Sequence, residues 1–250
     1  MKPNADLKKL FKKPILAYEK FHALTNKKFK LQKEVPLDQW PEEWKKIYYK
    51  GYPRLDSIRL PKKHLPNMSL EKTLKQRISD RSFSQKKLTL QELGSLFLYA
   101  AGLRSKTTHR YYPSAGARFP LELYFISTNT VLPNGIYHYY VLSHCLEQLS
   151  IFETFNYDLY VDQPWIKGAG GLLIISSLFK RTTNKYRNRG YRYTVCESGH
   201  LGQNIQLVSA CLNLACCGIG GFEDRKINRL LDIEGTEESS LYCFAIGNKV

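Results

Sequence analysis

The sequence predicts a layered domain of the α+β or α/β class, in which helices cover a sheet of buried strands. GLLIISSLF (171–179) is apolar at successive positions, as a strand buried on both faces is. Residues 194–216 read as a long buried helix, and LYCFAIG (241–247) reads as a second buried strand. Because helices and strands alternate along the chain, they are expected to share one layered core.

Composition limits the class of protein. At 250 residues, with 43% hydrophobic and 13% aromatic residues, the chain can bury one substantial globular core. The longest weakly polar stretch, GAGGLLIISSLF (168–179), is too short to span a bilayer, and residues 1–13 lack the apolar segment of a signal peptide. A cytoplasmic protein with no membrane partner is therefore expected.

The formal net charge of +16 is unevenly distributed. Residues 1–60 carry 15 Lys and Arg against 7 acidic residues, which is half of the net charge in a quarter of the chain. This asymmetry predicts a basic N-terminal extension (1–60) and a second domain (61–250). Such a surface attracts anions, whether nucleic acid, an acidic peptide, a membrane face or a phosphorylated cofactor, although it can also serve only solubility.

The extension is expected to contain one helix followed by an irregular segment. Pro14 can open a helix over 14–25, in which Tyr18, Phe21 and Leu24 recur at helical spacing. The following prolines and aromatic residues show no sustained periodicity. They predict an irregular wrap over the core, anchored by its large aromatic side chains, Trp40, Trp44, Tyr48 and Tyr52.

Helix start signals are clear in the next part of the chain. Ser69 begins a short helix that ends near Arg77. Thr89, with Glu92 three residues on, has the spacing of a capping box, and Gly102 provides a stop for this second helix. Thereafter LELYFIS (121–127) predicts a strand, and VLPNGIYHYYVL (131–142) predicts two short strands about a Pro-Asn-Gly turn.

Two function classes receive little support. The six cysteines show no CxxC pair and no histidine at ligand spacing, so no metal site is expected. None of the helix-turn-helix, RRM, KH or zinc-finger signatures is present, so nucleic acid is an unlikely partner and only the charge favours it.

Three short motifs carry chemistry. In RISDRSF (77–83), Arg77, Ser79 and Arg81 alternate, so two guanidinium groups and a hydroxyl can face a phosphate, although a surface loop at a helix end looks the same. PSAGA (113–117) lets backbone groups approach a flat ligand, or simply makes a tight turn. KYRNRGYRY (185–193) fits a nucleic-acid stacking surface, a solvated basic loop, or the wall of a site for a flat, anionic cofactor.

Taken in order, these motifs with P-L-E-L-Y, ESGHLGQN, GIGGF and a terminal AIG resemble the nitroreductase superfamily, and more narrowly its SagB-type branch of flavin oxidases, from about residue 69 to 247. The branch converts azolines to azoles in ribosomally made peptide natural products. The resemblance implies an α+β nitroreductase-like fold, a mostly antiparallel central sheet flanked by helices, and FMN bound at a homodimer interface. It also implies a peptide substrate and, as a further partner, a cyclodehydratase.

The resemblance assigns roles to the motif residues. Arg77, Ser79 and Arg81 fall where the family holds the phosphate and ribityl chain of FMN. Pro113, Ser114, Ala115 and Gly116 fall where the partner subunit usually touches the isoalloxazine, and Gly220 and Gly221 fall near its reactive edge. Glu197, His200, Gln203 and Asn204 match polar positions of the family, but they could equally be dimer-interface hydrogen bonds.

Two departures from the family pattern concern the phosphate. Ile78 stands where arginine or histidine is common, and the chain reaches Val250 without the basic residues that many nitroreductases carry after the last strand. Phosphate binding is therefore expected to depend on Arg77, Arg81 or a cation not yet assigned.

Lys185 and Tyr186 fall at a pair that SagB-type oxidases use in catalysis. Aromatising an azoline transfers a hydride to flavin N5 and releases a proton, which a lysine with a lowered pKa can accept. Tyr186 could relay that proton or orient the ring; alternatively, Lys185 is merely solvated and Tyr186 merely packs. The alternative functions are an NAD(P)H-dependent nitroreductase or ene-type reductase and, more remotely, a nucleic-acid-binding or scaffold protein with an inactive flavin fold.

Overall fold

The computed structural model describes residues 16–26, 36–104 and 107–250. Its centre is a seven-stranded sheet in the order β1-β4-β3-β2-β5-β7-β6. Every neighbouring pair is antiparallel, which confirms an α+β fold. The strands are β1 (Ser57–Arg59), β2 (Leu121–Ser127), β3 (Gly135–Tyr140), β4 (Cys145–Ile151), β5 (Gly171–Leu178), β6 (Leu214–Ile219) and β7 (Glu238–Asn248).

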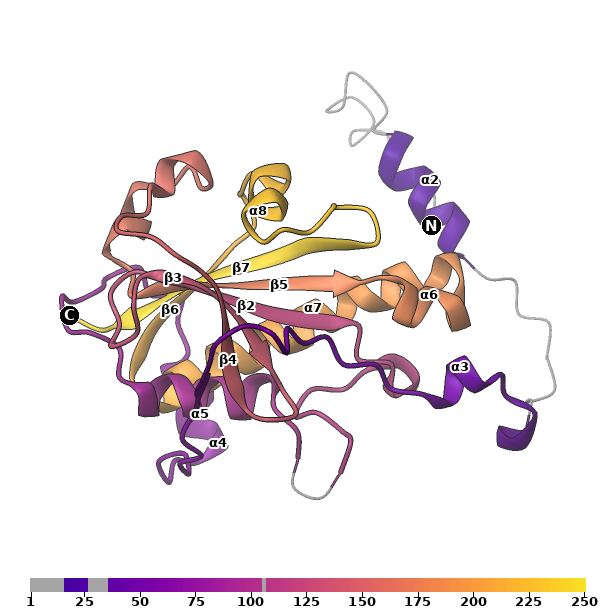
Figure 1. Cartoon of the computed structure of the whole chain (residues 1–250), viewed down its shortest axis with the longest axis horizontal. Coiled ribbons are helices and arrows are strands. Elements are labelled where there is room, and N and C mark those ends of the chain that lie inside the picture. Colours follow the sequence, from indigo (N-terminus) through magenta and orange to yellow (C-terminus); the bar gives the residue numbers. More distant parts are fainter. Residues whose placement is uncertain (1–15, 27–35, 105–106) are drawn as a thin grey trace, which may run out of the picture.

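Helices lie on both faces of this sheet (Figure 1). On one side are α4 (Leu70–Gln76), α5 (Leu90–Ala101) and α7 (Asn188–Cys211), and on the other is α8 (Asp224–Leu230). The buried hydrophobic residues accordingly form two clusters, one on each face of the sheet. Phe97 of α5 meets Phe125 of β2 edge-to-face, with ring centroids 5.9 Å apart, on the first side. Ile227 of α8 packs in a second buried cluster on the other side.

Local sequence signals account for α5 at both ends. The Thr89 hydroxyl accepts a hydrogen bond from the Glu92 backbone N–H at 3.2 Å, and the Glu92 carboxylate accepts one from the Thr89 N–H at 2.7 Å. Gly102 caps the carboxyl end, as predicted. The predicted strands over 121–127, 171–179 and 241–247 are also confirmed as β2, β5 and β7.

Two predicted elements are wrong. Residues 131–134 form no strand, because the backbone N–H of Val131 instead bonds to the carbonyl of Leu88. The hairpin turns one strand later, between β3 and β4, where His144 adopts a positive φ of 49°. The helix expected over 194–216 ends at Cys211, because the chain turns through Asn213 (φ 56°) and LACCGI continues as β6.

KYRNRGYRY is helical rather than a loop. α6 (Lys180–Tyr186) ends at Arg187, which has φ 50°, and α7 begins at the next residue. Gly190 permits this junction, because a Cβ there would lie 2.9 Å from the Cα of Thr183 on α6. The basic aromatic motif therefore surrounds a sharp bend between two packed helices.

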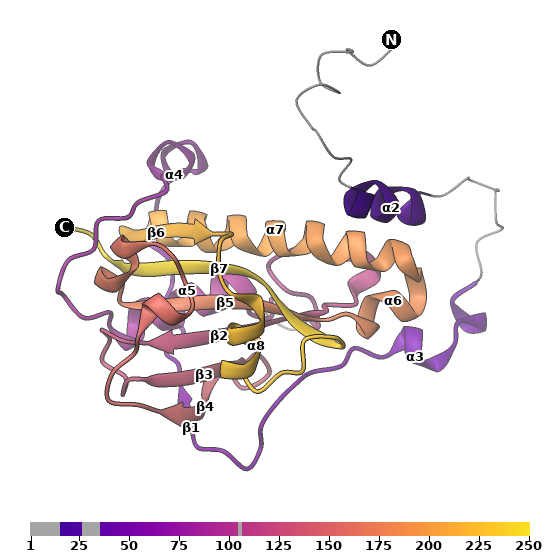
Figure 2. The ribbon, with the colours of Figure 1, turned by 90° about the horizontal axis from the view of Figure 1, so that it is seen from above.

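The N-terminal part adds three short elements and one strand. α2 (Leu16–Thr25) packs on α7, where the rings of Phe21 and Tyr191 are 5.3 Å apart (Figure 2). Pro14, the predicted start of this helix, lies outside the described residues. η1 (Leu37–Gln39), α3 (Glu42–Lys45) and β1 follow, and β1 pairs with β4. The division of the chain at residue 60 stays a prediction.

One predicted anchor of the wrap is wrong. Tyr48 is 48% exposed, whereas its neighbours Ile47 and Tyr49 pack against the core. The predicted anchor Tyr52 is half-buried, and its ring centroid lies 5.2 Å from that of His138. Lys50 reaches further inward, to a carboxylate on β7. Within the described part of the chain, no helix combines the length and apolarity needed to cross a membrane.

Candidate active site

The first cluster of predicted site residues follows α4. Ser69 caps this helix and Arg77 ends it, so the RISDRSF motif leaves the helix in extended form. Arg77 is half-buried and its Nη1 donates to Oε1 of Gln206 on α7, at 3.0 Å. The backbone N–H of Asp80 donates to the carbonyl of Cys216, at 3.0 Å, which fixes the motif along β6.

Cationic side chains gather around this motif. The Arg81 guanidinium lies 5.5 Å from the ring centroid of Trp165, so one of its faces is covered while the side chain stays exposed. Lys249 Nζ lies 3.9 Å from a carboxylate oxygen of Asp80. Lys249 thus directly follows the last strand, beside the predicted phosphate residues. The expectation that no basic residue follows this strand is therefore wrong.

Gly220 and Gly221 directly follow β6. Both are exposed, and a Cβ at either position would have no atom within 4 Å. Packing within this chain therefore does not require glycine here. Space over this backbone fits the predicted approach of a flat ring, and Phe222 ties the segment down by a bridge to Val161.

The second cluster is built on the turn of Ser114, Ala115 and Gly116. Gly116 has φ 60°, a conformation that glycine adopts without strain. The turn is held from inside, because the Ser114 hydroxyl accepts a hydrogen bond from the Phe119 N–H and donates one to a carboxylate oxygen of Glu197, both at 2.8 Å.

Lys185 and Tyr186, at the end of α6, lie against this turn. A Cβ at position 116 would collide with the Tyr186 hydroxyl and lie 3.5 Å from Lys185 Nζ. Glycine at 116 thus lets the predicted catalytic pair approach the backbone. Partial burial, and then the charge of Arg118, lower the pKa of Lys185 below its usual range. Burial raises the pKa of Tyr186, so its hydroxyl keeps its proton.

Glu197 of α7 is the functional candidate whose importance the sequence did not reveal. It is 1% exposed, and its Oε1 has no hydrogen-bond partner. Burial raises its pKa to about 8, although hydrogen bonds from Ser114 and the Ala115 backbone favour the charged form. A neutral carboxyl group behind the Ser114–Gly116 turn can donate a hydrogen bond, which an ionised one cannot do.

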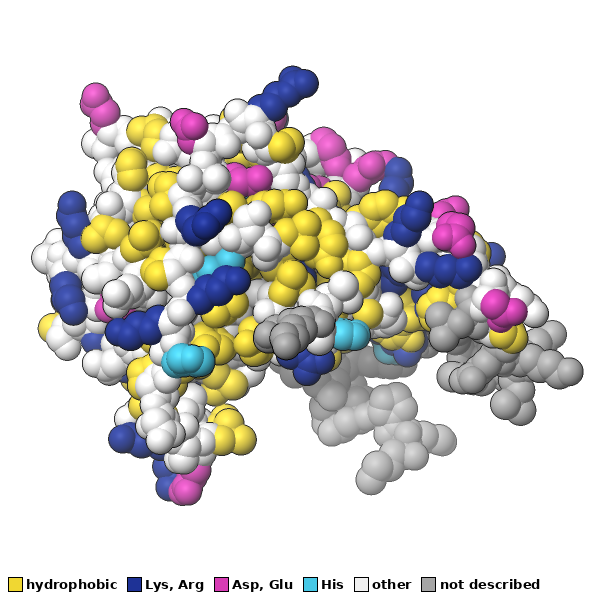
Figure 3. All heavy atoms as spheres, turned by 60° about the horizontal axis from the view of Figure 1, so that its bottom comes forward, with side chains coloured by type: hydrophobic (Ala, Val, Ile, Leu, Met, Phe, Trp, Pro, Cys, Tyr) yellow, Lys and Arg dark blue, Asp and Glu magenta, His cyan; other side chains and the backbone are white. Residues whose placement is uncertain are grey.

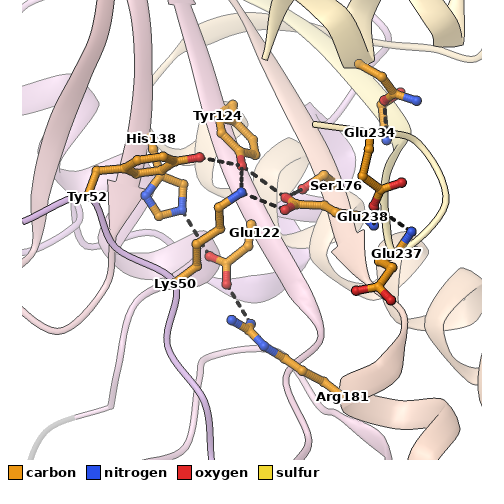
Figure 4. Close-up of polar contacts among 12 residues, drawn as sticks. Lys50, Tyr52, Glu122, Tyr124, His138, Ser176, Arg181, Glu234, Glu237 and Glu238 are labelled. Atoms are coloured by element: carbon orange, nitrogen blue, oxygen red, sulfur yellow. Dashed lines mark hydrogen bonds and ion pairs between the residues drawn. The ribbon is translucent and has the colours of Figure 1, made fainter. Parts of the chain in front are cut away.

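A buried polar network supports α6 from beneath (Figure 4). Arg181 of α6 donates to Glu122 of β2 at 2.5 Å, and His138 lies between Glu122 at 3.1 Å and Glu147 at 2.8 Å. Burial disfavours the charged forms, but the ionic partners prevail: they hold the pKa of Glu122 near 2 and raise that of His138. The network fixes the first turn of α6, the helix that carries Lys185.

One chain does not bring its two clusters together. Arg77 contacts Gln206 and Ser114 contacts Glu197, and these two α7 residues lie nine positions, or about 13 Å, apart along the helix. Both ribbon views show α6 at one end of the molecule and the C-terminus, near Lys249, at the other (Figures 1 and 2). The two clusters are therefore separate regions of one chain.

The surface outside these clusters bears on two other kinds of site, a basic nucleic-acid surface and a metal site. On the face drawn in Figure 3, Lys and Arg side chains are dispersed among hydrophobic and acidic ones and form no continuous basic stripe. Among the described residues, no group of three or more His, Cys, Asp and Glu side chains is placed to hold a metal ion.

Comparison with known proteins identifies the class. The sequence profile of the nitroreductase family matches residues 74–248. MJ1384 of Methanocaldococcus jannaschii, whose name places it among the nitroreductases, is 31% identical over 199 residues, which are 78% of this chain and 98% of that protein. The chain therefore belongs to the nitroreductase family, a family of oxidoreductases, as its motifs predicted.

Two further relatives bear on the narrower branch. The microcin B17-processing protein McbC of Escherichia coli is 29% identical over 51% of this chain and 50% of its own length. The trifolitoxin-processing protein TfxB of Rhizobium leguminosarum is 26% identical over 60% of this chain and 41% of its own. The chain thus spans half or less of these two relatives, and their names confirm the resemblance to the SagB-type branch.

A solved structure supports the fold. The E. coli microcin synthetase McbBCD complex with truncated pro-MccB17 bound contains a chain with a TM-score of 0.63 and 23% identity, covering 93% of this chain and 92% of that one. At this level of identity, the likeness shows the fold alone.

The residues present fit a flavin, the cofactor that nitroreductases generally use. In the first cluster, Arg77 and Arg81 belong to the motif that the Asp80–Cys216 hydrogen bond fixes along β6, the strand that Gly220 directly follows. In the second cluster, the buried Oε1 of Glu197 lacks a partner directly behind the turn that would face the ring. The arginines thus suit the phosphate of a flavin, and the carboxyl group of Glu197 suits the polar edge of its ring.

Proposed function

We propose that this protein is an FMN-dependent oxidase that converts azolines to azoles, or acts on a related modified peptide, during the maturation of ribosomally made natural products. One observation carries the proposal: Lys185, an amine with a lowered pKa, lies beside Tyr186 and against the backbone of Gly116. Two segments that are far apart in the sequence thus place a base at the surface expected to face the cofactor.

FMN would be held by the two clusters as half-sites, each supplied by one subunit of a homodimer. Arg77, Ser79, Arg81 and Lys249 would bind its phosphate and ribityl chain, because guanidinium and ammonium groups donate charge-assisted hydrogen bonds. The open backbone at Gly220 and Gly221 would lie near the ring on one face. The partner's turn, Pro113 to Gly116, would cover the other. When bound, FMN supplies the two-electron acceptor that aromatisation requires, and dioxygen or another acceptor takes the electrons onward.

The protein's own contribution is to move a proton. Neutral Lys185 Nζ accepts the proton that leaves the azoline carbon, and the lowered pKa keeps a larger neutral fraction near pH 7 than an ordinary lysine has. Tyr186 retains its proton and orients the heterocycle through its hydroxyl. The rate should therefore rise with pH toward a plateau reached below the usual pKa of lysine.

A peptide substrate and a cyclodehydratase partner are part of this proposal. McbC and TfxB are named for processing microcin B17 and trifolitoxin, and the McbBCD complex holds a truncated precursor. The basic extension would dock an acidic leader peptide or the partner enzyme. Because Lys50 and β1 are built into the core, the deletion that tests this should remove residues 1–35 only. Unchanged turnover and partner binding in that folded variant would remove the docking role.

The first experiment is the absorption spectrum of the purified protein, followed by acid release of any chromophore. We expect FMN at about one per subunit. A colourless protein that also refuses added FMN would overturn the proposal.

Lys185→Ala then separates catalysis from cofactor binding. The variant should retain the yellow cofactor and lose oxidation by about 10²-fold or more, because the lost amine acts on substrate. Lys180→Ala, on the exposed start of the same helix, is the matched control and should keep both properties. Normal turnover by Lys185→Ala would refute the role of this base.

A reductase that uses NAD(P)H is the second candidate, because the relative that this chain covers almost completely, MJ1384, bears the nitroreductase name. Rapid bleaching of the bound flavin by NADPH, with no dependence on Lys185, would favour it.

A further inference from the structure

The ammonium group of Lys185 rests on aromatic rings from the N-terminal wrap. Its Nζ lies 3.3 Å from the ring centroid of Trp40 and 5.5 Å from that of Trp44. The two indoles meet edge-to-face, with their centroids 6.1 Å apart. The Tyr186 ring adds a third face, at 5.5 Å. Cations are attracted to such faces within about 6 Å of the centroid.

Arg118 fixes the backbone that carries these indoles. This residue is 4% exposed, and its guanidinium donates to the carbonyls of Glu43, Trp44 and Lys46, at 2.8 Å for Glu43 and 2.5 Å for Lys46. Its Nε donates to the carbonyl of Arg181 on α6, at 3.2 Å. One buried side chain thus ties the wrap to the helix that bears Lys185.

The chain contains an instructive contrast in Lys50. Lys50 pairs with the Glu238 carboxylate at 2.6 Å; although burial opposes its charge, this partner raises its pKa. Among the described residues, Lys185 forms no ion pair, and its side chain instead meets π faces. A ring orients an ammonium group without supplying the full negative charge with which a carboxylate stabilises the protonated form, so a lysine held in this way can still act as a base.

We propose that Trp40 is a positioning residue for Lys185, and that the segment Leu37–Lys46 is the part of the N-terminal extension that completes the active site. Trp40 holds the amine over the Gly116 turn, while Arg118 holds the segment in place. The inference deepens the proposed function and rests on it for the role of Lys185. It also gives this segment a task other than docking a partner.

Paired substitutions test the contact. Trp40→Leu removes the ring and should lower kcat about tenfold, equivalent to about 1.4 kcal/mol, with unchanged FMN content. Trp40→Phe keeps a π face and should stay within about threefold of the parent. Tyr48→Leu, which removes an exposed ring two residues beyond this segment, is the matched control and should change nothing. Full activity in Trp40→Leu, or equal losses in the Phe and Leu variants, would overturn the inference.

A spectroscopic readout tests the geometry without turnover. The protein labelled with 5-fluorotryptophan should give three fluorine resonances for its three tryptophans, and Trp40→Phe identifies one. That resonance should shift with pH as Lys185 titrates, and the shift should vanish in Lys185→Met. Trp165 serves as the internal reference. A Trp40 signal that ignores pH, or that titrates identically in Lys185→Met, contradicts the contact.

The two readouts distinguish the possible failures. Normal oxidation by Lys185→Ala, together with a fluorine shift that depends on Lys185, would refute the proposed base but not the contact. Lost oxidation in Lys185→Ala with full activity in Trp40→Leu would refute the positioning role alone.

Discussion

The buried carboxyl group of Glu197 is kept neutral at a cost in folding stability. Its folded-state pKa of about 8 lies above the ordinary value of 4.5, so ionisation is penalised in the folded state. Stability is therefore intact below about pH 4.5 and declines as the pH rises toward 8. Such a cost is expected where a neutral donor is required.

Glu197→Gln should remove this penalty. In the cofactor-free protein at pH 7, we expect the free energy of unfolding to rise by a few kcal/mol, on the order of 3 from the pKa difference, with little change near pH 4. Denaturant unfolding at the two pH values measures it. A variant that is equally destabilised at both would show that the carboxylate is ionised and needed for stability.

The phosphate cations make a second prediction at this scale. Arg77→Ala should lower FMN occupancy strongly, and Lys249→Ala should weaken FMN binding by about tenfold, because each removes a charge-assisted contact. Titration of the cofactor-free variants with FMN, followed by fluorescence, gives the Kd. Arg225→Ala and Lys226→Ala, both on exposed positions of α8, are the controls. Unchanged affinity in Lys249→Ala would show that Lys249 does not bind the phosphate, which would leave that role to Arg77 and Arg81.

At the scale of elements, local signals decided what the sequence could predict. α5 was predicted at both ends because its capping box and terminal glycine lie within the helix's own sequence. The helices of KYRNRGYRY were not predicted, because the bend at Arg187 depends on packing between α6 and α7, which no local pattern records. β6 was missed because a short apolar run such as LACCGI is compatible with a buried helix as well as with a buried strand.

The same reasoning applies to the candidate site. The motif residues were identifiable because glycines, arginines and the Lys-Tyr pair recur in a fixed order. Trp40 could not be assigned, since its role arises from a contact with a residue more than 100 positions away. Lys249 was overlooked, although it stands two residues after the last predicted strand. Glu197 was ambiguous because its identity does not tell whether both of its oxygens are satisfied.

The capping box of α5 is open to a direct test. Thr89→Ala should lower the free energy of unfolding by about 1 kcal/mol, since the backbone N–H of Glu92 loses its acceptor. Urea unfolding followed by circular dichroism measures it. Thr154→Ala, at an exposed loop position, should stay within about 0.5 kcal/mol of the parent. Equal stability of both variants would mean that packing alone fixes the start of α5.

At the scale of the whole molecule, the two half-sites predict complementation between inactive subunits. In a two-fold dimer, Arg77 of one chain would serve the same flavin as Lys185 of the other. Arg77→Ala and Lys185→Ala proteins, each inactive, should regain about a quarter of the parental activity when unfolded together and refolded as a mixture, since half of the dimers are hybrids with one intact site. No recovery, with hybrids verified by mass, would place both residues in one chain's site.

The hydrogen bond from Lys50 to Glu238 joins residues 188 positions apart. During synthesis, the ammonium group of Lys50 therefore lacks this partner until almost the entire chain has left the ribosome. Other contacts of the wrap involve residues that are made earlier, because the backbone N–H of Tyr52 bonds to the Glu147 carboxylate and the guanidinium of Arg118 bonds to the carbonyl of Trp44. The ion pair of Lys50 with Glu238 is thus a contact between the wrap and the sheet that becomes available only late in synthesis.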